Sequence, residues 1–452
     1  MSGTGDGPRR HLGALHALLL TLGMVITSDI LKTAPTVALN VGSQAFYPVW
    51  ILGGLLSMVG ALCYVEMASA FAHPGGDYHF LRLAYGSRVG FLFAWSRLAI
   101  LHTGWIALMA FMFSDYLSAA LPFGRLGQGL FAAALVAAMV GLNLIGVRMS
   151  LVTQAVLVGL LSLGFASIVS AGVWLHLQGF QPLPAVVEES PGQGGVAGFS
   201  AALIYVFLAF GGWSDAATLS AELRDGRRGI FIAMIGALLA LLGIYLALNW
   251  AFIQGLGYAG LAASGAPAVE LLGQAFGAPG IALIVVVVGV SAVASINSTL
   301  IVGSRTTYAA ARDVPLLGRL GHWDARHGVP RAALLAEGAV ALALVAVGSL
   351  GGNGFNTMVE YMTPVYWLFL SLSGVALLVL RRRYPQVPRP LRVPLYPWLP
   401  LLFIGLCLYM FYASLAYVGW GALLGLLVLL VGAALLPWLR PDSQPSALEE
   451  GV

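Results

Sequence analysis

Charged residues are scarce in this chain. Only 9% of its 452 residues are Asp, Glu, Lys or Arg, whereas soluble globular domains carry about 25%. So few charges do not cover a water-exposed surface, which excludes a soluble fold. Hydrophobic residues instead make up 59% of the chain, and this composition indicates a protein that lies within a membrane.

Cysteine and the usual catalytic signatures are also nearly missing. The two cysteines, Cys63 and Cys407, both lie in apolar runs, so they indicate neither a disulfide framework nor metal ligands. The sequence contains no phosphate-binding glycine loop, no His/Cys metal spacing and no nucleophile beside a base. An enzyme is therefore not expected, and neither is a cofactor. The net charge of +4 does not predict a nucleic-acid partner, because the arginines lie in short loops between apolar runs.

Twelve apolar runs are long enough to cross a membrane, which takes about 20 residues per helix. The sequence therefore predicts an all-α integral membrane protein with about twelve transmembrane helices. Its expected segments are a tail at 1–12, five helices at 13–176, an external loop at 177–195, five helices at 196–382, two trailing helices at 397–440 and a tail at 441–452.

The basic residues predict how the chain is oriented. Nearly all of the 22 Lys and Arg fall in loops on the same side as the N-terminus, and Arg125 is the exception among the loops. Positive loops stay in the cytoplasm. We therefore expect a multi-pass protein of the cell inner (plasma) membrane, surrounded by lipid, with both termini cytoplasmic.

Two of the runs are interrupted by polar and helix-breaking residues. The first reads LGMVITSDILKTAP at 22–35, and the sixth reads FLAFGGWSD at 207–215. Irregular backbone at membrane depth is tolerated only where it lines a cavity or is covered by protein. The breaks lie five helices apart, at equivalent positions in the two halves, which is the pattern of an inverted-repeat transporter with its site between discontinuous helices. Close helix packing is the alternative interpretation of Gly211 and Gly212.

Several further segments resemble amino acid–polyamine–organocation permeases. They are ALCYVEMA at 61–68, HPGGDY at 73–78, GFLFAW at 90–95, GSRTTYAAARD at 303–313 and RPLRVPLYP at 389–397. They follow the family order over nearly the whole chain. The resemblance implies a five-plus-five inverted repeat with discontinuous helices 1 and 6, two trailing helices, alternating access, and amino acids or related amines as substrates.

The chain departs from this family at two positions. The first-helix break of the family usually reads Gly-(Ser/Ala)-Gly-Ile-Phe, whose amides hold the substrate carboxylate, and here residues 27–31 read TSDIL. Both glycines are absent, and Asp29 replaces one of them. Many proton-coupled members also carry a lysine midway along the fifth helix, where this chain has Leu161. A cation has been lost from the fifth helix, and an anion has been gained on the first.

Asp29 has three interpretations. A carboxylate at mid-membrane is costly, so it is expected to face a cavity or a partner. It is a proton-coupling group, a partner for the ammonium of an amine substrate, or one half of an ion pair with Lys32, the only lysine of the chain. Lys32 alternatively extends toward the outer interface.

Other polar residues have structural alternatives beside functional ones. Asp215 caps the short half-helix or contacts substrate, and Asp115 is expected to be solvated. Glu66 and Glu222 are expected to pair with loop arginines as an inner gate. His102 is a proton carrier or a hydrogen-bonded structural residue.

The predicted substrate site combines both breaks with one aromatic wall. Trp105 offers a cation–π face or packs between helices, and Phe210 resembles the family's aromatic gate. In the eighth run, Ser295, Asn297, Ser298 and Thr299 supply oxygens for Na⁺ beside Asp29, or bond their own helices. The candidate substrate contacts are Thr27, Ser28, Asp29, Ile30, Lys32, Trp105, Phe210, Gly211, Gly212, Trp213 and Ser214, and the candidate ion-coupling residues are Asp29, Ser295 and Ser298.

The sequence therefore predicts a secondary transporter for amino acids or related amines. H⁺ is the expected coupling ion, with Na⁺ symport as an alternative. An amine or polyamine exchanger and a transport-inactive solute sensor of the same fold are the alternative functions.

Overall fold

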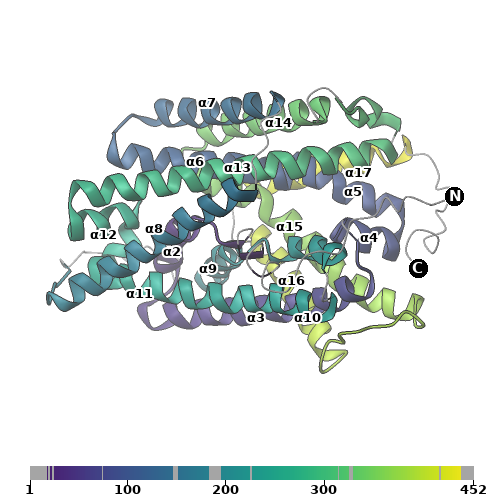
Figure 1. Cartoon of the computed structure of the whole chain (residues 1–452), viewed down its shortest axis with the longest axis horizontal. Helices are drawn as coiled ribbons and strands as arrows, with labels where there is room; N and C mark the ends of the chain where they lie inside the picture. Colours follow the sequence, from purple (N-terminus) through teal and green to yellow (C-terminus); the bar gives the residue numbers. More distant parts are fainter. Residues whose placement is uncertain are drawn as a thin grey trace.

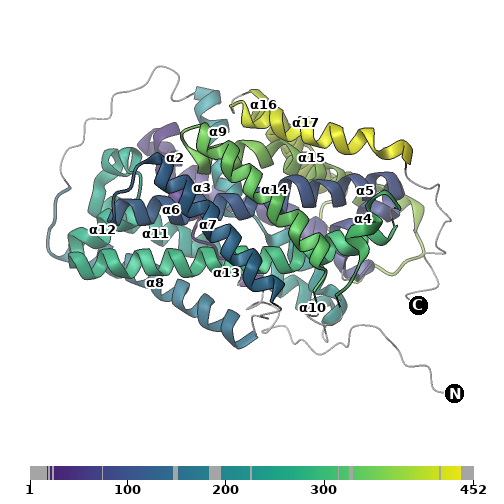
Figure 2. The same cartoon turned by 90° about the horizontal axis from the view of Figure 1, so that it is seen from above.

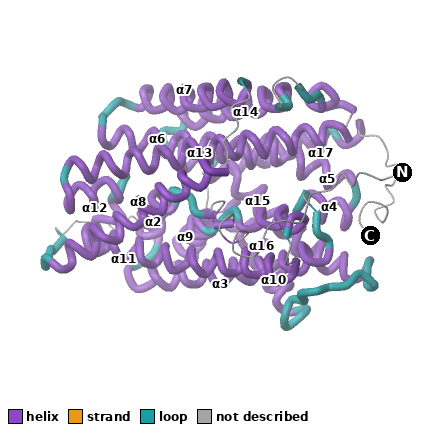
Figure 3. The backbone as a smooth tube through the Cα atoms, in the orientation of Figure 1, coloured by secondary structure: helices purple, strands orange, loops and turns teal. Residues whose placement is uncertain are grey.

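Long helices, joined by short loops, form almost all of the structure (Figures 1 and 3). This computed structural model describes residues 18, 21–22, 25–73, 75–145, 151–182, 195–223, 226–313, 315–324, 329–416 and 419–438. The helices are α2 (Ile30–Asn40), α3 (Ser43–Ala70), α4 (Asp77–Tyr85), α5 (Ser87–Ser96), η1 (Arg97–Leu101), α6 (His102–Ala120), α7 (Arg125–Leu144), α8 (Leu151–Leu177), α9 (Gly195–Ala209), η2 (Trp213–Glu222), α10 (Gly226–Phe231), η3 (Ile232–Gly236), α11 (Ala237–Ala263), α12 (Pro267–Phe276), α13 (Ala278–Asp313), η4 (Pro315–Gly321), α14 (Arg331–Leu350), α15 (Gly354–Arg383), α16 (Trp398–Ala416), α17 (Gly421–Ala434) and η5 (Leu436–Trp438).

Eleven of the described helices are long and apolar enough to span a membrane. The remaining predicted span, at 13–38, is only partly described, and its helix α2 begins at Ile30. The chain is thus a multi-pass membrane protein. The two predicted tails lie outside the described residues, as does most of the predicted loop at 177–195.

Two sets of spans pack into distinct groups. In the core group, α2 packs against α9 and α11, and α3 packs against the same two helices. In the frame group, α6, α7, α13 and α14 contact one another. Figure 1 shows the frame group above the core group. Figure 2 shows the molecule from above, with α7 and α14 of the frame group nearest the viewer.

Each group takes the same spans from both repeats. The core group holds the first two spans of each half, and the frame group holds the third and fourth. Because the repeats begin five spans apart, an odd number, the second runs through the membrane in the opposite sense to the first. This is the five-plus-five inverted repeat that the resemblance implied.

The two ends of the bundle differ in what they hold. One end carries α4, α10, η4 and the loop at 384–397, and we call it the α4 end (Figure 1). The other carries α12 with the turns at 121–124 and 351–353, and we call it the α12 end. Beside the two groups, α15 packs against α16, α17 and α6.

Candidate functional site

The first span is interrupted at the predicted place. Residues 26–29 are not helical, and α2 starts at Ile30. The Asp29 side chain is fully buried. One of its carboxylate oxygens accepts a hydrogen bond from the Thr27 hydroxyl, and the other has no hydrogen-bond partner. The break therefore holds a buried acid that is only half satisfied, at the positive N-terminal end of a helix.

The sixth span is interrupted at the equivalent place. Helix α9 ends at Ala209, and the 3₁₀ helix η2 follows three non-helical residues. Gly212 has a φ of 85°, a left-handed conformation that favours glycine. A Cβ on Gly211 would lie 2.9 Å from the Leu208 carbonyl oxygen. Both glycines are therefore required by the shape of the break.

Tyr245 of α11 connects the two breaks. Its hydroxyl donates a 2.7 Å hydrogen bond to the Ala209 carbonyl, which the break leaves without a helical partner. Its ring lies 5.2 Å from that of Phe210 and 5.8 Å from that of Trp50, and Asp29 is near enough to act on it electrostatically. Asp29 and the sixth-span break thus share one aromatic neighbourhood.

Lys32 does not pair with Asp29, so that interpretation was wrong. Its ammonium lies 2.8 Å from the Asp115 carboxylate of α6 and donates to the Gly265 carbonyl before α12. Asp115 keeps 25% of its side-chain surface exposed and also forms this ion pair. Lys32 lies three residues beyond the unwound segment, and its ammonium is directed toward the α12 end by these two contacts. Lys32 therefore leaves the Asp29 charge uncompensated and links α2 to the frame group.

Asp215 forms a matching ion pair on the other side of the breaks. It lies 2.8 Å from Arg97, in the π-helical turn η1 of the third span. Asp215 lies in the first turn of η2, whose N-cap residue is Gly212. Asp77 of α4 acts electrostatically on Arg97, and burial raises the pKa of Asp77 to about 6 against the opposing effects of Tyr64 and Arg97. These acids and one arginine link the sixth span, the third span and α4.

The remaining predicted site residues lie in several environments. Trp105 donates a 2.8 Å hydrogen bond to Ser295, which joins α6 to α13. Asn297 accepts from Asn143 of α7, and Ser298 lies half-buried on α13. Trp213 packs edge-on against Tyr64 of α3 and against Phe403 of α16. The Trp213 ring therefore packs between η2 and the helices α3 and α16. Ser28, Ile30 and Ser214 are buried beside the breaks, and Phe210 is fully buried in the aromatic cluster.

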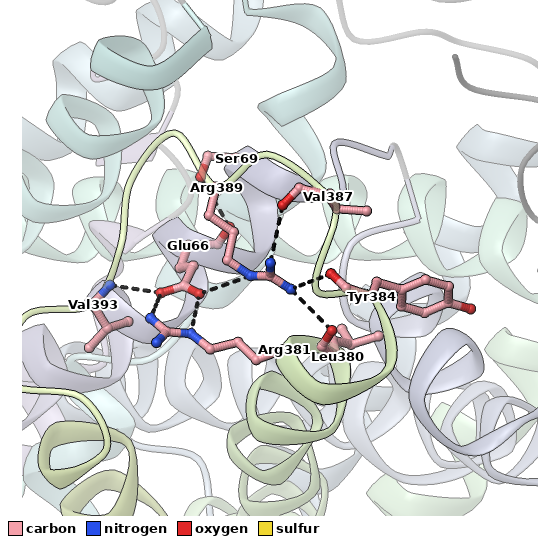
Figure 4. A network of polar contacts seen from close by, with 8 residues as sticks. All are labelled: Glu66, Ser69, Leu380, Arg381, Tyr384, Val387, Arg389 and Val393. Atoms are coloured by element: carbon pink, nitrogen blue, oxygen red, sulfur yellow. Dashed lines mark hydrogen bonds and ion pairs between the residues drawn. The ribbon is translucent and has the colours of Figure 1, made fainter.

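Glu66 pairs with arginines as predicted. Figure 4 shows the Glu66 carboxylate accepting hydrogen bonds from Nε and Nη2 of Arg381. Nε of Arg389 lies 3.5 Å from one carboxylate oxygen, and the Val393 amide donates to the other at 2.7 Å. The carboxylate is only 1% exposed. This cluster attaches the loop at 384–397 to α3. The side chain of Glu222 lies outside the described residues.

One buried acid, Glu337, was not among the residues predicted from the sequence. Glu337 of α14 has no exposed surface, and its carboxylate lies 3.7 Å from the His102 imidazole. Neither Glu337 oxygen has a hydrogen-bond partner. The signal was present, because Glu337 is an acid inside an otherwise apolar run of membrane-spanning length.

The two helix breaks place free backbone groups and the buried Asp29 carboxylate in one region, which suits the binding of a small cation. Among the described residues, no group of three or more His, Cys, Asp or Glu lies close enough to hold a metal ion. Helix breaks offer bare backbone N–H and C=O groups, and Asp29 adds a carboxylate. A proton or an ammonium group satisfies such a carboxylate.

The known proteins to which this chain is similar are amino acid permeases, transporters or exchangers. A family model described as "Amino acid permease" matches residues 12–433. The b(0,+)-type amino acid transporter 1 of Mus musculus is 26% identical over 416 residues, which cover 90% of this chain and 83% of that protein. The serine/threonine exchanger SteT of Bacillus subtilis (strain 168) is 26% identical over 403 residues, with 88% and 90% covered. The large neutral amino acids transporter small subunit 2 of Mus musculus is 26% identical over 411 residues, with 89% and 76% covered.

Proposed function

The chain belongs to the amino acid permease family, and we propose that it moves amino acids or closely related amines across the cell inner membrane by alternating access, driven by H⁺. Its relatives are named as amino acid transporters or exchangers, and it is a transporter rather than an enzyme. The names of the relatives support the substrate class. The coupling ion is our own proposal.

The proposed substrate site lies between the two helix breaks. It comprises the Asp29 side chain, the backbone from Thr27 to Lys32 on the first span and from Phe210 to Ser214 on the sixth, with Trp105 on the frame group. The free amides at the start of α2 suit a carboxylate, and the carbonyls at the end of α9 suit an ammonium. A zwitterion needs both kinds of group.

One observation carries the coupling proposal. The second carboxylate oxygen of Asp29 is buried without a hydrogen-bond partner, and Lys32 is engaged by Asp115. A buried ionised carboxylate without a partner is unfavourable. Asp29 therefore holds a proton in the closed state and releases it when the break is opened to water. Pairing with a substrate ammonium is the alternative way to satisfy it.

Exchange is the second candidate mode. The exchanger of Bacillus subtilis matches 88% of this chain, and an exchanger needs no net proton movement.

The arginine-rich α4 end faces the cytoplasm in our proposal, because positively charged loops remain inside.

The test is transport by purified protein in proteoliposomes, with a panel of amino acids and their decarboxylated amines. We expect saturable counterflow of at least one amino acid, and faster uptake when the outside is acidic. In Asp29→Asn, pH-driven uptake falls by roughly tenfold or more while counterflow persists, because only the driving step needs the proton.

The control is Glu270→Gln, which changes an exposed acid of α12 and is expected to behave as wild type. Undiminished pH-driven uptake in Asp29→Asn contradicts H⁺ coupling at this residue. Uptake of the amines alone makes Asp29 the ammonium partner. Counterflow that ignores the pH gradient favours exchange.

A further inference from the structure

A second buried acid lies apart from the helix breaks, where three helices of the frame group meet. The Glu337 carboxylate of α14 and the His102 imidazole of α6 are 3.7 Å apart. Gly303 of α13 faces both of them. A Cβ on Gly303 would lie 1.8 Å from a Glu337 oxygen and 2.7 Å from the nearer His102 nitrogen. The pair therefore occupies space that exists because α13 has no side chain there.

The pair is sealed from most other polar groups. Both Glu337 oxygens and the facing Nδ1 of His102 are buried without hydrogen-bond partners. In the part of the chain that the structure describes, no arginine or lysine forms an ion pair with Glu337. The ionisable group that faces the Glu337 carboxylate is therefore the His102 imidazole.

The surrounding helices supply few other charges. Arg97 and Asp215 act electrostatically on His102, but they form an ion pair with each other. From α15, the hydroxyl of Tyr361 donates to the Ala99 carbonyl. The amides of Asn143 on α7 and Asn297 on α13 bond one another, and Arg319 of η4 is exposed.

Charge balance fixes how many protons such a pair holds. With one proton, the pair is neutral overall, either as a carboxylic acid beside a neutral imidazole or as a carboxylate beside an imidazolium. Removing that proton leaves a buried anion, and adding a second leaves a buried cation. Both changes are unfavourable in a sealed, apolar site. The pair is therefore built to hold one proton and to release it only when its surroundings change.

The position of the pair gives that proton a route. Glu337 is six residues from the start of α14, so it lies about 9 Å along the helix from the α4 end. The His102 side chain keeps 10% of its surface exposed, whereas Glu337 keeps none. His102 is therefore the member of the pair that keeps some exposed surface.

The third span connects the pair to the region of the sixth-span break. His102 directly follows the π-helical turn that carries Arg97, and Arg97 pairs with Asp215 beyond the sixth-span break. π-helical turns in α-helices often mark functional positions. Loss of the Arg97–Asp215 contact changes the charge that His102 experiences.

We propose that Glu337 and His102 form a proton-binding site of the frame group, separate from Asp29, which takes up and releases one proton at the α4 end when the Arg97–Asp215 contact opens. Proton binding here does not depend on the proposed function. Only its use during transport rests on that proposal.

The first test is infrared spectroscopy of the whole protein in lipid, as difference spectra between acidic and alkaline buffer. Wild type is expected to show a titrating carboxyl signal that disappears in Glu337→Gln. Its pH midpoint is expected to shift in His102→Gln, because the imidazole no longer shares the proton. Glu360→Gln is the matched control, since Glu360 lies on a spanning helix, near Gly419 and Gly421. Identical difference spectra for wild type and Glu337→Gln overturn the proposal.

The second test is transport, and it separates this proposal from the previous one. We expect Glu337→Gln to keep counterflow and to change the pH profile of driven uptake, with no further change on adding His102→Gln. Wild-type protein without any counterflow would contradict the proposed function, and the infrared signal would still decide the proton site. An unchanged pH profile in Glu337→Gln limits the pair to a structural role and overturns its use in transport.

Discussion

Glu66 illustrates how single polar residues are accommodated within this protein. Its carboxylate is buried, yet Arg381, Arg389 and the Val393 amide surround it (Figure 4). The guanidinium of Arg381 also lies 3.7 Å from the centre of the Tyr396 ring, so the same arginine holds the loop at 384–397 in two ways. The acid stabilises the protein because its partners are all in place.

Removal of this carboxylate is expected to be strongly destabilising. Glu66→Ala leaves the Arg381 guanidinium and the Val393 amide without their acceptor, and loss of one partner of a buried pair costs about 3–5 kcal/mol. Thermal unfolding in detergent measures this as a lowered midpoint. Glu270→Ala, which removes an exposed acid, is the control. Equal midpoints for the two variants would contradict the assigned role of the cluster.

At the scale of the element, the two broken spans depend on tyrosines from neighbouring helices. Tyr245 bonds the Ala209 carbonyl at the end of α9, and Tyr116 bonds the Leu31 carbonyl at the start of α2. A helix break frees backbone groups that lipid cannot satisfy. Tyr245 supplies a hydrogen bond that the sixth-span break leaves missing. The Leu31 carbonyl lacks a helical partner because Pro35, four residues on, has no N–H, and Tyr116 replaces that bond.

Tyr245→Phe tests this support directly. The ring packing with Phe210 and Trp50 is kept, but the Ala209 carbonyl loses its donor, at a cost of about 1–3 kcal/mol. We expect a lower thermal midpoint and slower counterflow, because the sixth-span break bends differently. Tyr47→Phe removes a half-buried hydroxyl of α3 that takes no part in either break and serves as the control. Wild-type behaviour of Tyr245→Phe would show that the break needs no hydroxyl cap.

At the scale of the whole molecule, the third span connects the two groups at both ends. Asp115 holds Lys32 toward the α12 end, and Arg97 holds Asp215 toward the α4 end. Both ion pairs join a frame-group span to a broken span of the core group. Under the alternating-access mechanism that we propose, we expect these two contacts to open in turn.

Hydrogen exchange on the intact protein distinguishes these two contacts. Lys32→Gln is expected to speed backbone exchange at the α12 end, in residues 261–270, and to leave 213–222 unchanged. Arg97→Gln is expected to do the reverse, because it releases η2 from the third span. An equal increase at both ends in either variant would mean that the two contacts do not act as separate gates.

The sequence alone determined the fold class, eleven of the twelve predicted spans and the position of both breaks. Hydropathy and helix-breaking residues are local properties, since lipid forces each span to satisfy its own backbone. They were enough to place the break at Asp29 and the break at Gly211 and Gly212. The arginine pairing of Glu66 followed from its place near a basic loop.

Only the tertiary structure decided which polar groups meet. Lys32 lies three residues from Asp29 in the chain, but the start of α2 directs it to Asp115 of another helix. Glu337 and His102 are far apart in sequence and meet because Gly303 leaves room between their helices. Partner choice depends on how helices rotate and cross, and a hydropathy pattern carries no information about either. The electrostatics of this transporter were therefore settled by packing.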